Sequence, residues 1–128
     1  MNRNTIPFAF VVDELFSLRP IVKPFFGMFS VYIDTKIVLI LRQRKQHPEA
    51  NGVWIATTAE HHATLRKDLP SLCSIPIYTD GTVETGWQML PEAADDFEQS
   101  AIKVCELILN EDERIGKIPK PRRKKNRV

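Results

Sequence analysis

Two hydrophobic patterns divide this chain. Near its start, apolar residues recur every three to four positions, which is typical of an amphipathic helix. The members of this stripe are Phe8, Val11, Val12, Leu15 and Phe16. We expect Thr5 to cap this helix, and Pro20 to stop it because proline cannot continue the helical hydrogen-bond ladder.

The second pattern is rich in β-branched and aromatic residues and predicts strands. It runs from Phe29 to Arg42 and is interrupted by Asp34-Thr35-Lys36, as in a hairpin turn. We expect a further strand before it, near residues 21–26, and a fourth at residues 53–56, after a polar loop. Gly27 would be a pivot at the opening of the hairpin.

The next segment mixes both patterns. Thr57 and Glu60 have the spacing of a capping box, which predicts a second, shorter helix over residues 59–69. Ile75 and Ile77 alternate around Pro76, and proline within a strand pattern favours a sheet edge. We expect a turn at Asp80-Gly81 and then a last strand that contains Trp87 and Met89 and ends at Leu90-Pro91.

A final helix is predicted from Pro91, since proline suits the first helical position and Glu92, Asp95 and Asp96 suit the positive end of the helix dipole. Its apolar stripe is formed by Ala94, Phe97, Ala101, Val104, Cys105 and Ile108. It should either end near Asn110 or be followed there by a fresh turn. The predicted fold class is α+β: a two-layer domain with an antiparallel sheet of five to six strands. The expected order is helix, three or four strands, helix, two strands and a C-terminal helix packed on the sheet.

Charge is distributed unevenly along the chain. The formal net charge is +2, yet the last fourteen residues hold seven of the 18 Lys and Arg side chains and no acid. These seven are Lys117, Lys120, Arg122, Arg123, Lys124, Lys125 and Arg127. The first 114 residues therefore carry eleven basic against sixteen acidic side chains. We expect a single domain over residues 1–114 and a basic, disordered tail over residues 115–128.

Two interpretations of the tail stay open. Its cations could contact phosphates and release counterions, which gives salt-sensitive, sequence-independent binding to nucleic acid. They could equally fold over the acidic body of the same chain. The seven cations are therefore candidate nucleic-acid-binding residues.

Candidate catalytic chemistry is sparse. His61 and His62 are neighbours, so on a helix they point about 100° apart, whereas metal-binding pairs use i, i+3 or i+4 spacing. We interpret His62 as a half-buried packing residue and His47 as solvated. The adjacent acids Asp95-Asp96 and 111–113 suit helix ends or solvation. No nucleophile elbow, phosphate loop or dinucleotide motif occurs. We therefore expect no enzyme, no cofactor, no metal and no small-molecule substrate.

The cysteines and the hydropathy pattern bear on location. Cys73 and Cys105 stand far apart and outside any CxxC pair, which favours reduced thiols in a reducing compartment. The longest aliphatic run, residues 37–41, is far shorter than the roughly 20 residues of a membrane-spanning helix. We expect a cytoplasmic protein without a membrane partner.

Two motifs resemble a known family. The run Phe25-Phe26-Gly27-Met28-Phe29-Ser30-Val31-Tyr32 looks like the Met-Phe-Gly-Gly-Tyr-Gly-Leu-Tyr signature of the TfoX N-terminal domain-like family of bacterial competence regulators. The run from Trp87 to Pro91 looks like that family's strand-to-proline junction. The signature residues carried over are Phe26, Gly27, Tyr32, Trp87 and Pro91. Met28 and Ser30 depart from the pattern, since the family often has glycine there.

The resemblance covers residues 8–109 and implies a two-layer α+β domain that contacts other macromolecules, with no cofactor or catalytic residue. The basic tail stands where full-length family members carry a second, helical domain. The strand aromatics Trp54, Trp87, Tyr32 and Tyr78 are interpreted as core or interface anchors. We therefore expect a non-enzymatic interaction or regulatory module that binds a protein partner or a second copy through its sheet or an edge strand near Pro76. The alternative is a nucleic-acid-binding accessory protein that uses the tail.

Overall fold

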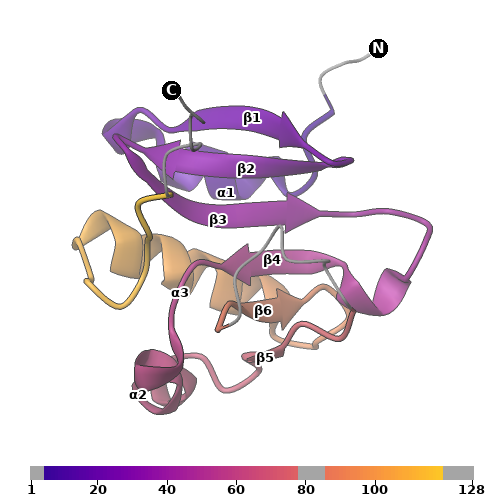
Figure 1. Ribbon diagram of the computed structural model, residues 1–128. Coiled ribbons are helices and arrows are strands. Elements are labelled where there is room, and N and C mark those ends of the chain that lie inside the picture. The colour runs from indigo at the N-terminus through magenta and orange to yellow at the C-terminus, as the bar shows by residue number, and fades with distance from the viewer. Residues whose placement is uncertain (1–4, 78–85, 120–128) are drawn as a thin grey trace, which may run out of the picture.

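One antiparallel sheet organises the molecule. The computed structural model describes residues 5–77 and 86–119. The strands are β1 (Ile21–Phe25), β2 (Met28–Ile33), β3 (Lys36–Arg42), β4 (Gly52–Ile55), β5 (Cys73–Ser74) and β6 (Gln88–Pro91). Their order across the sheet is β1-β2-β3-β4-β6-β5, and all neighbours are antiparallel (Figure 1).

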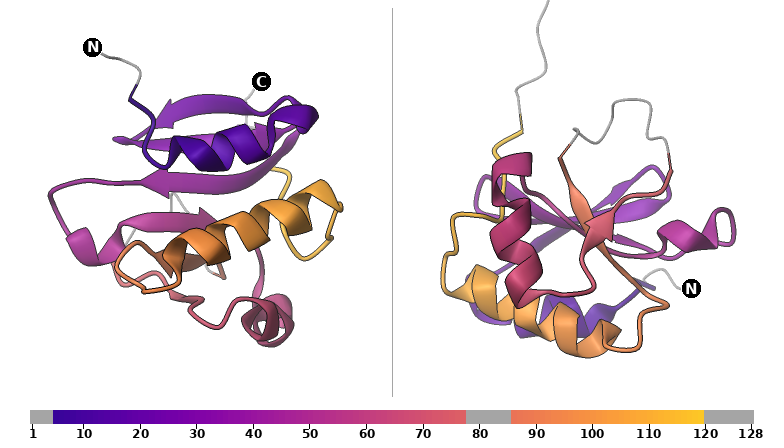
Figure 2. Two further views of the ribbon diagram at one scale, coloured as in Figure 1. Left: turned by 180° about the vertical axis from the view of Figure 1, so that it is seen from behind. Right: turned by 90° about the horizontal axis from the view of Figure 1, so that it is seen from below.

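The helices lie mainly on one face of this sheet. They are α1 (Ala9–Glu14), α2 (His62–Asp68) and α3 (Phe97–Leu109). Helices α1 and α3 pack side by side against the same face, whereas α2 lies at the side of the sheet where β6 and the edge strand β5 are (Figures 1 and 2). The predicted α+β fold class, with six strands and the C-terminal helix on the sheet, is confirmed.

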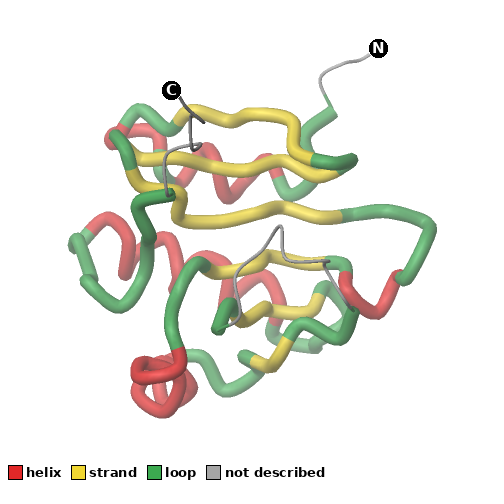
Figure 3. Tube along the Cα trace, viewed as in Figure 1, coloured by secondary structure: helices red, strands yellow, loops and turns green. Residues whose placement is uncertain are grey.

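Two tight turns connect the first three strands. Phe26 and Gly27 both have positive φ, 50° and 79°, so β1 and β2 are joined by a two-residue turn of type I′. Asp34, with φ 55°, begins the turn between β2 and β3 that the sequence predicted. The tube in Figure 3 shows this meander as three neighbouring strands. Gly27 therefore closes one hairpin and precedes the next.

The outer edge of β1 is poor in hydrogen-bond donors. A two-residue turn closes on a hydrogen-bonded pair, here Phe25 with Met28, and such pairs alternate along antiparallel strands. The backbone groups of Val22 and Pro24 therefore point outward from the sheet. Proline has no N–H, so within β1 Val22 alone offers a donor to an added strand. Such an edge resists pairing with another chain.

The core has two parts, one on each face of the sheet. The larger cluster fills the space between the sheet and helices α1 and α3, and it includes the apolar stripe that the sequence predicted for α3. The smaller cluster lies on the opposite face around Ile40, Trp54 and Met89, each about 1% exposed. Trp87 is also buried there, so the prediction that the strand tryptophans are core residues is confirmed. Tyr32 is half-buried at the rim, and Tyr78 lies outside the described residues.

Several predicted helix starts are wrong. Phe8, not Thr5, is the N-cap of α1, and no side chain caps it. Thr57 is buried, and its hydroxyl has no hydrogen-bond partner, so it is no capping residue. Pro91 is the last residue of β6, where it pairs with Gly52. Strand β6 therefore includes Pro91, and turns follow over residues 92–96. Helix α3 begins only after them, at Phe97.

Other boundaries differ for local reasons. After α1, the chain tightens into a 3-10 turn over Phe16–Leu18, which breaks the 3.6-residue spacing and leaves Phe16 79% exposed. The edge strand is β5, just before the predicted strand around Pro76. The end of α3 is as expected, with Asn110 as C-cap. The predicted turn at residues 80–81 lies outside the described residues.

The segment after α3 is attached to the sheet. Ile115 is buried, and Gly116 donates to the carbonyl of Ala56 over 2.8 Å. Lys117 and Ile37 exchange two backbone hydrogen bonds of 3.0 and 2.9 Å. Residues 115–117 thus take the place beside β3 that β4 leaves when it ends, so they pack with the body although the sequence predicted a tail from 115.

Arg114 ties this segment to α2. Its guanidinium donates to Asp112 over 2.7 Å and to Asp68 over 2.8 Å. The hydrogen bond from Arg114 holds the pKa of Asp112 below its ordinary value of 3.8, and the two carboxylates raise the pKa of Arg114. The C-terminal end of α2 and the loop after α3 are therefore held together by charge.

Replacing Gly52, the first residue of β4, and Gly27, in the turn before β2, should have unequal effects. A Cβ at Gly52 would overlap the backbone carbonyl of Leu90, which cannot move aside. A Cβ at Gly27 would meet the flexible end of Arg44 at 2.7 Å. We expect Gly52→Ala to lower the free energy of unfolding by at least about 3 kcal/mol and Gly27→Ala by about 1–2 kcal/mol. Urea unfolding measures both, and equal losses would contradict the structure.

The Arg114 network should make stability depend on pH. We expect Arg114→Met to lower the free energy of unfolding by about 1–3 kcal/mol at pH 7. Because the pKa of Asp112 is lowered in the folded state, this stabilisation is present above pH 4 and is lost as pH falls through the folded-state pKa. Arg66→Met is the matched control, since Arg66 donates to the neutral Gln88 over 2.8 Å. A pH-independent loss in Arg114→Met would contradict the assignment.

Candidate functional site

A hollow lies where α1 and α3 begin, on the helix-covered side of the sheet. Its volume is about 690 Å³. The residues that line it are Phe8, Phe10, Gln43, Glu92, Ala94, Asp95, Phe97, Glu98 and Gln99. They come from the start of α1, the loop after β3, the loop after β6 and the first turn of α3. We call this feature the aromatic-acidic hollow.

Three phenylalanines give the hollow its apolar character. The rings of Phe8 and Phe97 pack edge to face with centroids 5.1 Å apart. Phe97 is 7% exposed, whereas Phe8 and Phe10 are half-buried. Phe8 is the N-cap of α1 in a left-handed conformation, so the helix begins directly after it. The start of α1 thereby brings two rings next to the first residue of α3.

Three carboxylates accompany these rings. Glu92, Asp95 and Glu98 line the hollow and are all exposed, and among residues 5–77 and 86–119 no Lys, Arg or His lines it. Glu92 accepts a hydrogen bond of 2.9 Å from the side chain of Gln43. A surface that combines aromatic faces with carboxylates attracts positively charged groups.

The loop that carries Gln43 is held from inside. Arg42 is buried, and its guanidinium donates to the carbonyls of Gln46 and His47 and to the side-chain oxygen of Asn51, each over 2.8 Å. The same oxygen accepts the backbone N–H of Arg44 over 2.9 Å. A buried guanidinium satisfied by fixed oxygens is a rigid support. This network therefore fixes one wall of the aromatic-acidic hollow.

The opposite wall, the loop between β6 and α3, is also anchored. The backbone N–H of Glu92 donates to the carbonyl of Asn51 over 2.8 Å. The hydroxyl of Ser71 donates to Asp96 over 2.5 Å, and this bond holds the pKa of Asp96 below its ordinary value. Asn51 thus contacts both walls, and the hollow is largely preformed.

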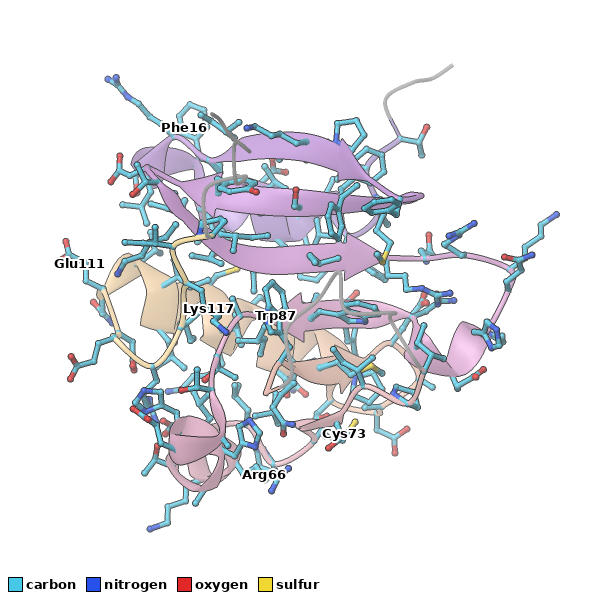
Figure 4. All side chains as sticks on the ribbon, viewed as in Figure 1. Phe16, Arg66, Cys73, Trp87, Glu111 and Lys117 are labelled. Atoms are coloured by element: carbon cyan, nitrogen blue, oxygen red, sulfur yellow. The ribbon has the colours of Figure 1, made fainter. Side chains whose placement is uncertain are left out.

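A second surface lies at the far end of α1. Phe16 is 79% and Ile21 52% exposed, and Phe16 lines a hollow of about 600 Å³ together with residues that include Val12, Arg19 and Pro20. Figure 4 shows Phe16 close to the start of β1. Because the adjacent edge of β1 is poor in donors, contacts here would be made by side chains.

The histidines do not converge. His62 is half-buried, as expected, and donates from Nε2 to the carbonyl of Gly86 over 2.6 Å. The ring of His61 lies 3.4 Å from Glu60, and that of His47 lies 3.3 Å from Glu49. Within residues 5–77 and 86–119, no three His, Cys, Asp or Glu side chains come together as a metal site would require.

The two thiols are free and differ in environment. Cys105 is fully buried on the core side of α3, and burial raises its pKa to about 12. Burial also raises the pKa of Cys73, and the nearby positive charge of Arg66 opposes this rise. The sequence does not show this cation, because α2 and β5 meet only in the folded chain (Figure 4).

The residues singled out from the sequence do not form one site. Of the seven candidate nucleic-acid-binding cations, Lys117 pairs with β3, and the other six lie outside the described residues. Of the family signature, Phe26 and Gly27 form an exposed turn, Tyr32 and Trp87 lie on the face opposite α1 and α3, and Pro91 ends β6. The aromatic-acidic hollow was missed, because its residues were assigned to helix stripes and helix ends.

Comparison of the chain with models of protein families, with curated proteins and with solved structures found no match. The resemblance to the TfoX N-terminal domain-like family therefore stays a prediction. Among the described residues, no helix has the length and apolar character needed to cross a membrane.

The thiols should react unequally. We expect iodoacetamide to modify Cys73 slowly in the native protein at about pH 8 and to leave Cys105 unmodified, because thiolate is the reactive form. Mass spectrometry of peptides locates the label. Cys73→Ser is the control, in which label should be incorporated only after denaturation. Labelling of Cys105 in the native control variant would contradict the described core.

Proposed function

We propose that this protein is a non-enzymatic interaction module that binds a cationic segment of a partner protein in the aromatic-acidic hollow. The observation that carries the proposal is the composition of the hollow, in which three phenylalanines and three carboxylates converge and to which no described residue contributes a cation. The family resemblance points in the same direction, since it implies a domain that contacts macromolecules.

The chemistry of the hollow fits Lys and Arg side chains. Their aliphatic stems can pack on Phe8 and Phe10 while their charged ends reach Glu92, Asp95 or Glu98. The faces of aromatic rings add cation–π attraction. The anchored walls support binding without large rearrangement, which limits the entropic cost of association.

The cellular location is part of the proposal. Both Cys73 and Cys105 are free thiols, and thiols stay reduced in the cytoplasm. We therefore place the module there, as an interaction or regulatory protein.

A peptide titration tests the function. We expect a fluorescent dodecapeptide rich in Lys and Arg with two leucines to bind, and its counterpart with Glu at each cationic position not to bind. The triple variant Glu92→Gln, Asp95→Asn, Glu98→Gln should weaken binding roughly 10-fold or more, since three charge contacts are lost. Fluorescence anisotropy at low and high salt measures the dissociation constant.

The control keeps the charge change and moves it away from the hollow. Glu14, Glu106 and Glu113 are exposed acids that do not line it, and their simultaneous replacement by Gln should change affinity less than about 3-fold. If the control variant weakens binding as much as the triple variant, the attraction is general and the hollow is not the site.

A second candidate function is binding of nucleic acid through the basic tail. It is favoured by the charge of residues 115–128, which hold seven cations and no acid. We expect retention on duplex DNA to fall steeply with salt, with a log-log slope of magnitude no greater than about six for seven phosphate contacts. Replacement of the six cations after Lys117 by Gln should abolish it. A mobility-shift titration at two salt concentrations measures the salt dependence and the effect of the substitutions. Unchanged retention of the Gln variant on DNA would refute this second function.

A further inference from the structure

We infer that the aromatic-acidic hollow binds the basic tail of a second copy of this chain, so that two copies exchange their tails reciprocally. This inference rests on the proposed function and names the partner. It joins two features of opposite charge, the hollow at one end of β3 and the basic segment that follows Lys117 at the other end.

The tail has the chemistry that the hollow would recognise. Residues 120–128 contain six cations and no acid, interspersed with Pro121 and Val128. Ile118, just before this segment, is 69% exposed. The tail therefore offers positive charge to the carboxylates and aliphatic stems to the phenylalanines. Prolines reduce the entropy that the free tail loses on binding, because they restrict its conformations.

The tail begins far from the hollow of its own chain. Lys117 pairs with Ile37 at the start of β3, whereas Gln43, six residues further along, lines the hollow, which is a separation of about 20 Å along the strand.

The separation along β3 alone uses several residues of the tail. Fully extended, residues 118–123 span about 20–22 Å. Lys120, Arg122 and Arg123 would therefore fall short of the hollow of the same chain. The tail of a second copy has no such limit, because the two bodies can approach freely.

Reciprocal exchange also closes the assembly. A one-way contact between a hollow and a tail would propagate from copy to copy, whereas two exchanged tails give a two-fold dimer. The second contact then forms at high effective concentration, so weak single contacts give a stable pair. Because the outer edge of β1 is poor in hydrogen-bond donors, this dimer would form without strand pairing at β1.

Mixing two variants tests the inference. The hollow variant carries Glu92→Gln, Asp95→Asn and Glu98→Gln; the tail variant carries Gln at Lys120, Arg122, Arg123, Lys124, Lys125 and Arg127. We expect the unchanged protein to form a salt-sensitive dimer and each variant alone to be monomeric. An equal mixture should form a one-to-one complex, at least 10-fold weaker than the original dimer, since one intact hollow meets one intact tail. Sedimentation velocity with one variant labelled measures this.

Other outcomes overturn the inference in distinguishable ways. A monomeric unchanged protein whose hollow still binds the cationic peptide would refute tail exchange and leave the proposed function standing. Loss of peptide binding as well would refute both. If the hollow variant still forms a dimer, the contact lies elsewhere and the inference is refuted. Dissociation of that dimer by Phe16→Ser would place the contact at the far end of α1. The variant with Gln at Glu14, Glu106 and Glu113 should dimerise normally.

Discussion

The packing of α1 against α3 over one face of the sheet is the constraint on which the rest of the structure depends. Both helices turn apolar residues toward the same cluster, in which Val11, Leu15 and Val104 are fully buried. The thiol of Cys105 on α3 donates to the carbonyl of Val11 on α1 over 3.6 Å. A short helix such as α1 has little stability alone, so it persists through this burial. The position of α1 relative to α3 is therefore set by the core.

The aromatic-acidic hollow is a consequence of that packing. Because α1 and α3 begin at the same end of the sheet, the first residues of both helices meet there. The edge-to-face contact of Phe8 with Phe97 continues the core outward, and the acids that precede and open α3 remain exposed beside it. These acids also suit the positive end of the α3 dipole. A feature that favours the helix thus gives the hollow its charge.

The sheet separates the two charged parts of the molecule. The segment that leads to the basic tail is attached at Ile37, at one end of β3, and the three carboxylates of the hollow lie at the other end. The net charge of +2 hides this separation. The start of the tail is thereby held away from the hollow of the same chain. Pro24 removes a backbone donor from the outer edge of β1, so pairing with an added strand is unfavourable at this edge.

The sequence by itself determined the elements whose signals are local. The hairpin between β2 and β3, the apolar stripe of α3 and its end at Asn110 follow from periodicity and turn chemistry, which depend on near neighbours. The start of α3 was predicted too early, because Pro91 is a good first helical residue but pairing with Gly52 keeps it in the sheet. The spacing of Thr57 and Glu60 predicts a capping box, yet Thr57 is buried, because local spacing carries no information on burial.

Only the tertiary structure decided which side chains from distant parts of the chain lie together. Phe8 and Phe97 stand 89 positions apart, and nothing in either local pattern indicates that their rings meet at 5.1 Å. The exposure of Phe16 depends on a 3-10 turn that follows α1, and the surroundings of Cys73 depend on how α2 meets β5. Long-range packing combines many weak contacts that no single segment encodes. The sequence therefore determined the elements with local signals and the charge of the last residues, and the fold decided which aromatic and acidic side chains share one surface.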